Sequence, residues 1–180
     1  STIFLIILVW SAVVLPLEPC AAGDEDVDPF DVYAVDGSGE QLLHITVRPN
    51  GNQVRVVKEG VLAMPGKPHG IARHPTQSVF VVTLLGKGAE SPRAVTLVRG
   101  SDGKPAIAGI TGLQDSTGYT SFDRTGGYFL TSSYHDGHCD VYQVKPDGVV
   151  GDRVSHQQVA EKYAHSVLTT PDNKFLYVPC

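Results

Sequence analysis

Short apolar runs separated by turn residues make up the chain after residue 31. Runs rich in Val, Ile, Thr, Tyr and Phe alternate with Gly, Pro, Asn and Asp, and the 180 residues include 19 Gly and 12 Pro. This pattern is typical of many short strands joined by tight turns. Residues 31–180 show neither the i, i+3, i+4 spacing of amphipathic helices nor an alternation of strands with helices. The pattern therefore predicts an all-β fold.

One stretch of this pattern occurs three times. The copies align without gaps at offsets of 50 (119 − 69) and 46 (165 − 119) residues, and each reads as strand, turn, strand. They are HGIARHPTQSVFVVT from His69, YTSFDRTGGYFLTSS from Tyr119 and HSVLTTPDNKFLYVP from His165. Self-similarity at such a period is the mark of a repeat architecture.

A second block repeats in phase with the first, and each copy is a strand, a polar turn containing Gly, and another strand. The copies are ITVRPNGNQ from Ile45, VTLVRGSDGKP from Val95 and VYQVKPDGVVG from Val141. Four short strands in 46 to 50 residues is the period of a β-propeller blade. A β-sandwich has no reason to repeat at this spacing. We therefore predict about three four-stranded antiparallel blades, with the strands around Ile71, Ser121 and Val167 innermost.

Propellers close with roughly four to eight blades, because each sheet buries its faces against two neighbours. Three blades leave an open arc, and the last repeat has no counterpart of the outer two strands. We expect the chain to be the front part of a longer protein. Its open blade faces are expected to drive self-association.

The segment before the repeats has a different composition. Residues 2–17 carry no charge and are followed by Cys20-Ala21-Ala22, which resembles a secretory signal cleaved after Ala22. About sixteen apolar residues fall short of the roughly 20 that a membrane helix needs. We interpret residues 1–22 as a signal peptide or anchor, 23–30 as an acidic linker and 31–180 as a partial propeller. We therefore expect a secreted or periplasmic protein with no stable membrane span in the mature chain.

The charge pattern argues against nucleic acid as a partner. The net charge is −5, and the 14 Lys and Arg residues are scattered singly, so they form no basic stripe along a phosphate backbone. Outside the presumed signal, Cys139 and Cys180 match no zinc pattern. Whether these two cysteines pair stays open.

With the blades laid out, the sequence resembles the lactonase family of seven-bladed propellers, which includes propeller-type 6-phosphogluconolactonases and carboxymuconate-lactonising enzymes. The matching stretches are DVYAVDGSGEQLLHITVRPNG, TSSYHDGHCDVYQVKPDG and HSVLTTPDNKFLYVP. The resemblance implies about three blades of an expected seven. The arginine and acidic residues of the lactonising enzymes' active site lie in blades that this chain lacks. Only the histidine of that constellation has a counterpart, His165.

The alignment of the first block places His69, Tyr119 and His165 at one structural position, the start of the innermost strand at the mouth of the channel. A neutral imidazole can take a proton from a water that attacks a lactone carbonyl, or pass one to the leaving alkoxide. We predict that His165 is catalytic and that His69 and Tyr119 bind substrate. The alternative is that the three side chains only satisfy backbone groups or waters in a polar channel.

No metal or other cofactor is predicted. The stretch YHDGHCD, residues 134–140, is dense in potential ligands, but strand alternation sends neighbours to opposite faces, so we interpret it as a solvated hairpin. The acidic run at residues 23–31 does not fit an EF-hand loop and is interpreted as a flexible start of the mature chain. His74 falls in a turn and is predicted to lie on the surface.

The favoured function is a lactone hydrolase of the 6-phosphogluconolactonase-like family, which opens a carbohydrate or organic-acid lactone and has a small-molecule lactone as its partner. The alternatives are a non-catalytic propeller that binds a ligand in an exported compartment, and a lactonising cycloisomerase. The 180-residue chain alone is expected to be inactive, because catalysis at a channel mouth needs groups held by several blades.

Overall fold

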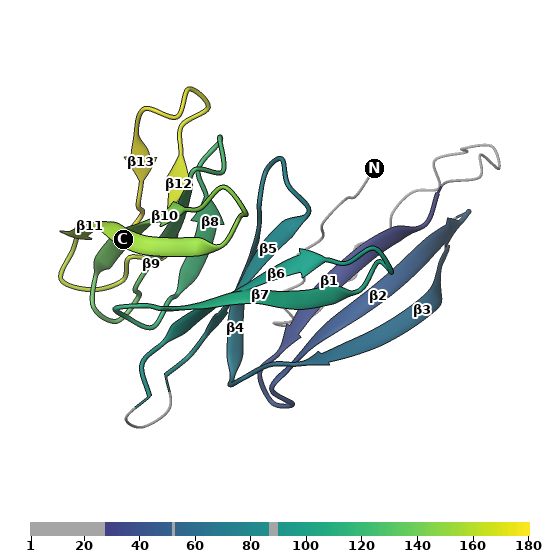
Figure 1. The fold of residues 1–180 in the computed structure, drawn as a ribbon. Coiled ribbons are helices and arrows are strands. Elements are labelled where there is room, and N and C mark those ends of the chain that lie inside the picture. The colour runs from purple at the N-terminus through teal and green to yellow at the C-terminus, as the bar shows by residue number, and fades with distance from the viewer. Residues whose placement is uncertain (1–27, 52, 87–89) are drawn as a thin grey trace.

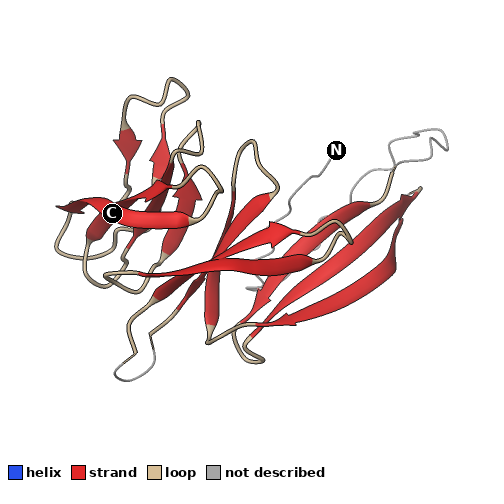
Figure 2. Ribbon diagram, viewed as in Figure 1, coloured by secondary structure: helices blue, strands red, loops and turns tan. Residues whose placement is uncertain are grey.

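A computed structural model describes residues 28–51, 53–86 and 90–180. The predicted signal segment, residues 1–22, lies outside the described residues, as does most of the predicted acidic linker. The described residues form thirteen strands and no helix (Figures 1 and 2). They therefore contain no helix that could cross a membrane. The all-β prediction is confirmed.

The strands form four antiparallel sheets that follow one another along the chain (Figure 1). The first is β1 (Phe30–Asp36), β2 (Gln41–Asn50) and β3 (Gln53–Ala63). The second is β4 (Pro68–Arg73), β5 (Val79–Leu84), β6 (Arg93–Arg99) and β7 (Pro105–Gly112). The third is β8 (Tyr119–Phe122), β9 (Tyr128–Ser132), β10 (His138–Val144) and β11 (Val150–Gln158). The fourth is β12 (Leu168–Thr169) and β13 (Leu176–Tyr177).

These sheets are blades of a propeller, in which consecutive strands pair as a meander. Two blades are complete among the described residues, while the first sheet has three strands and the last has two. The strands therefore amount to about three blades, but they are divided into two whole and two partial ones. β4 lies beside both β1 and β8, and Ser121 of β8 donates a hydrogen bond to the Val167 carbonyl, 2.7 Å away, just before β12.

The core lies between neighbouring blades, because strands such as β5 are covered on both faces. In β5, VFVVTL, every residue is buried. Val82 packs in a cluster with residues of the first sheet, whereas Val81 packs in a second cluster with residues of the third. A strand that is covered on both faces reads as a continuous apolar run, which is how this strand appears in the sequence.

The β4–β5 turn corrects one prediction, since His74 is buried with 2% of its surface exposed. Its Nδ1 accepts hydrogen bonds from the backbone N–H groups of Thr76 and Gln77, at 3.3 and 3.0 Å. Its Nε2 must then carry the proton, and it lies 3.1 Å from the carbonyl oxygen of Gly126 in the next blade. The prediction that His74 lies on the surface is wrong, because turns of adjacent blades pack against each other.

Both cysteines in the described residues are free. Cys139 is buried and Cys180 is exposed. Burial raises the pKa of the Cys139 thiol to about 11, so this thiol is an inert core group rather than a nucleophile.

Candidate functional site

The backbone bonds that close three turns show which residues are equivalent between blades. The N–H groups of His74, Asp123 and Thr170 each donate to the carbonyl five residues further on. Counting back five residues from each gives His69, Gly118 and His165. The gap-free alignment is therefore wrong by one residue in the middle blade: Tyr119, which pairs with Ser132, follows the equivalent position instead of filling it. Because successive side chains of a strand point to opposite faces, the slip reverses the direction of Tyr119.

His165 is exposed and lies immediately before the last blade. Its backbone N–H donates to the Pro179 carbonyl, 2.9 Å away. Its ring meets the ring of Tyr134 edge-on, with centroids 5.7 Å apart and planes at 80°. Within the described residues the imidazole makes no hydrogen bond, so both of its nitrogens can reach a ligand.

Tyr134 is the centre of an aromatic group beside His165. Its ring also lies 5.5 Å from that of His135 and 5.1 Å from that of Tyr163. The backbone fixes Tyr163, because its N–H donates to the Tyr134 carbonyl at 2.6 Å and its φ is 71°. A left-handed conformation is uncommon for a residue other than glycine. Sequence reasoning missed this group, because only the pairing of loops from separate strands creates it.

Glycine allows the loop that carries Tyr163 and His165 to approach the β9–β10 turn. The Gly137 carbonyl accepts hydrogen bonds from the N–H groups of Val159 and Ala160, at 3.0 and 3.2 Å. Gly137 has a φ of 67°, and a Cβ at this position would overlap the Ala160 carbonyl. The loop thus depends on glycine for both its conformation and its close contact.

His69 occupies the position equivalent to His165 in an earlier blade, within a register shift between Pro68 and Gly70. Partial burial of the ring and the charge of Lys67 lower the pKa of His69. His69 is therefore uncharged near neutral pH. In the described residues no hydrogen bond or ring contact joins His69 to His165.

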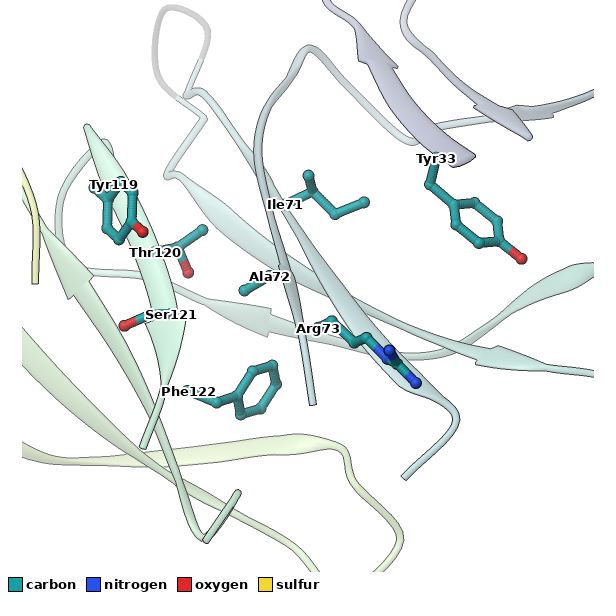
Figure 3. Close-up of a pocket in the computed structure, with 8 residues that line it drawn as sticks. All are labelled: Tyr33, Ile71, Ala72, Arg73, Tyr119, Thr120, Ser121 and Phe122. Carbon is teal, nitrogen blue, oxygen red and sulfur yellow. The ribbon is translucent and has the colours of Figure 1, made fainter. Parts of the chain in front are cut away.

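Tyr119 lines a pocket of about 240 Å³ to which strands β1, β4 and β8 of three successive sheets contribute. Figure 3 shows β4 between Tyr33 of β1 on one side and residues 119–122 of β8 on the other. Arg73 supplies a cation to the wall of this pocket. Tyr119 also packs against the apolar cluster that contains Val167.

The stretch at residues 134–140 is only partly a solvated hairpin. Residues 134–136 are exposed, but Cys139 and Asp140 are buried. Asp140 is held by side chains of β11: His156 Nδ1 lies 2.7 Å and Arg153 Nη1 lies 3.4 Å from its Oδ1.

Comparison with known proteins identifies the family. The family model described as "Lactonase, 7-bladed beta-propeller" matches residues 32–180. The chain belongs to this lactonase family. No curated protein matches the chain.

Solved structures of the same fold include three described as lactonases. The periplasmic gluconolactonase PpgL of Pseudomonas aeruginosa is 20% identical, with a TM-score of 0.67 over 84% of this chain and 47% of that one. A putative 6-phosphogluconolactonase from Bacteroides uniformis is 15% identical, with a TM-score of 0.66 over 82% and 43%. A second, from Bacteroides fragilis, is 9% identical, with a TM-score of 0.54 over 77% and 40%. The chain thus spans less than half the length of these structures.

Proposed function

We propose that the full-length protein is a lactone hydrolase and that His165 is its general base and acid. The membership of residues 32–180 in the lactonase family carries this proposal. The geometry around His165 supports it, since the ring is exposed, bears no hydrogen bond within the described residues and is positioned by Tyr134.

The reaction needs one proton acceptor that later becomes a donor. A ring nitrogen of His165 takes a proton from water as the water oxygen bonds to the lactone carbonyl carbon. When the ring C–O bond of the lactone breaks, the same nitrogen returns the proton to the leaving alkoxide, which gives a hydroxy acid. Imidazole suits both steps because its ordinary pKa lies near neutrality.

His69 and Tyr119 are proposed to bind the substrate. An uncharged His69 offers one hydrogen-bond donor and one acceptor to sugar hydroxyls. Tyr119 acts from the pocket that it lines together with β4, where its hydroxyl can donate a hydrogen bond to a sugar hydroxyl.

The substrate class is proposed to be an unphosphorylated sugar lactone such as gluconolactone, encountered outside the cytoplasm. One similar structure is described as a periplasmic gluconolactonase. The signal-like composition of residues 1–22 points to the same compartment. Phosphorylated sugar lactones belong to the cytoplasm. The two Bacteroides structures are described as putative 6-phosphogluconolactonases, which are named for such a phosphorylated lactone.

The test is acid release by the full-length protein from a panel of gluconolactone, 6-phosphogluconolactone and simple aliphatic lactones, each corrected for spontaneous opening. We expect gluconolactone to be opened with the highest kcat/KM. A higher kcat/KM for the phosphorylated lactone would contradict the proposed substrate class. If no lactone is opened faster than in buffer, the hydrolase proposal fails and a binding role replaces it.

A further inference from the structure

Side chains from two blades converge on one face of β10 and β11. His138 and Asp140 share a face of β10, because they are two residues apart. The register pairs His138 with Gln158 and Asp140 with His156 across the ladder, so all four side chains lie on the same face. The ring centroids of His138 and His156 are 4.4 Å apart, and the two planes meet edge-on at 69°.

Asp115 reaches this face from the loop between β7 and β8, which connects one blade to the next. Its Oδ2 lies 2.7 Å from Nδ1 of His138. One oxygen of Asp115 and one nitrogen from each of His138 and His156 lie within 4.8 Å of one another. All three side chains are partly accessible to solvent.

The surroundings of His156 are those of a metal ligand. Its Nδ1 lies 2.7 Å from the Asp140 carboxylate, which is 3% exposed and is also contacted by Arg153. A carboxylate that holds one ring nitrogen fixes the tautomer and leaves the lone pair of Nε2 to the ligand site. The buried Asp140 therefore orients the ring of His156.

We propose that Asp115, His138 and His156 bind a divalent transition-metal ion, with zinc as the best match. Two imidazoles and one carboxylate form a donor set that suits zinc. The same set suits calcium and magnesium poorly, because these ions prefer oxygen ligands. Ligand atoms around tetrahedral zinc are about 3.4 Å apart, given bonds of about 2.1 Å. The Asp115–His138 contact therefore widens by less than about 1 Å on binding.

The ion would join the β7–β8 loop to the β10–β11 ladder. Three protein ligands leave a fourth position for water. With the ion on Nδ1 of His138, its Nε2–H would donate to the amide oxygen of Gln158, which lies 2.7 Å away. The loop that holds Asp115 leads directly into β8, so the metal would fix the start of an inner strand. Its proposed role is structural, and it is independent of lactone hydrolysis.

The rival explanation needs no metal. A protonated His138 can donate one hydrogen bond to Asp115 and another to Gln158, and the hydrogen bond to Asp115 does raise the pKa of His138. That pair does not account for His156, whose Nε2 the buried Asp140 leaves available. Direct metal titration separates the two explanations.

The experiment is calorimetric titration of the EDTA-treated, dialysed full-length protein with ZnCl₂, with MgCl₂ as the comparison ion. Thermal unfolding is measured in parallel. We expect one equivalent of zinc to bind, no magnesium to bind, and excess zinc to raise the unfolding midpoint by at least about 2 °C. Cobalt in place of zinc should give the visible absorption of a tetrahedral site.

Variants locate the site. His156→Gln and Asp115→Asn should each weaken zinc binding at least tenfold, and Asp140→Asn should do so through the orientation of His156. His135→Gln changes an exposed histidine outside the cluster and should bind as the wild type does. Circular dichroism in EDTA shows that each variant is folded. The proposal is overturned if the wild type binds less than about 0.1 equivalent, or if His156→Gln and Asp115→Asn, when folded, bind zinc as the wild type does.

Discussion

At the scale of single residues, the Asp123 carboxylate closes one turn and ties it to the next blade. It accepts hydrogen bonds from the Tyr128 N–H at 2.8 Å and from Thr125. Asn173 of the following turn donates to it at 2.8 Å, and the Asn173 side chain in turn accepts from the Arg124 N–H. Burial alone would raise the pKa of Asp123, but the hydrogen bonds from Thr125, Tyr128 and Asn173 outweigh it and lower the pKa.

We predict that Asp123→Asn lowers the free energy of unfolding by about 1–3 kcal/mol, because buried donors lose a charged acceptor. The lowered pKa also sets a pH dependence. The contribution is fully present above the unfolded pKa of about 3.9 and is lost as the pH falls from there through the folded value. Urea unfolding from pH 7 to pH 3 measures both effects. Asp152→Asn, at an exposed strand position, is the control and should be neutral; equal behaviour of the two variants would contradict the assignment.

At the scale of elements, the repeat in the sequence predicted the meanders well, because turn residues and apolar runs recur at a blade's period. It did not predict side-chain direction, since that depends on register to a single residue. Tyr119 was assigned the direction of His165 because a gap-free alignment ignores where the turn begins. His156 and Asp115 were not singled out, because only the pairing of β10 with β11 and the packing of a loop bring them to His138.

Gly137 tests the packing of the loop that carries His165. We predict that Gly137→Ala lowers the free energy of unfolding by at least about 1 kcal/mol, because alanine disfavours the left-handed conformation and its Cβ would overlap the Ala160 carbonyl. Gly112→Ala is the matched control, since a Cβ there meets nothing within 4 Å, and it should be neutral. Urea denaturation of both variants gives the comparison, and an equally stable Gly137→Ala protein would contradict the packing described for this loop.

At the scale of the whole molecule, the described residues provide two complete blades and parts of two more, in a family described as having seven. The last sheet leaves Phe175 and Tyr177 exposed, at 65% and 64%. Self-association of the 180-residue chain through such faces stays a prediction. The sequence alone indicated the family, because the family's motifs occur in this chain in the expected order and spacing. The catalytic role of His165 stays a proposal, because no hydrogen bond within the described residues joins its imidazole to another side chain.

We propose above that His165 performs the proton transfers of lactone opening, and substitution of this histidine tests that role. The direct measurement is kcat of the full-length wild type, His165→Ala and His135→Ala on the lactone that the wild type opens fastest. His135 is a matched control, because it is an exposed histidine whose ring also contacts Tyr134. We predict that kcat falls at least about tenfold in His165→Ala and is unchanged in His135→Ala. Equal kcat values for His165→Ala and the wild type would contradict it.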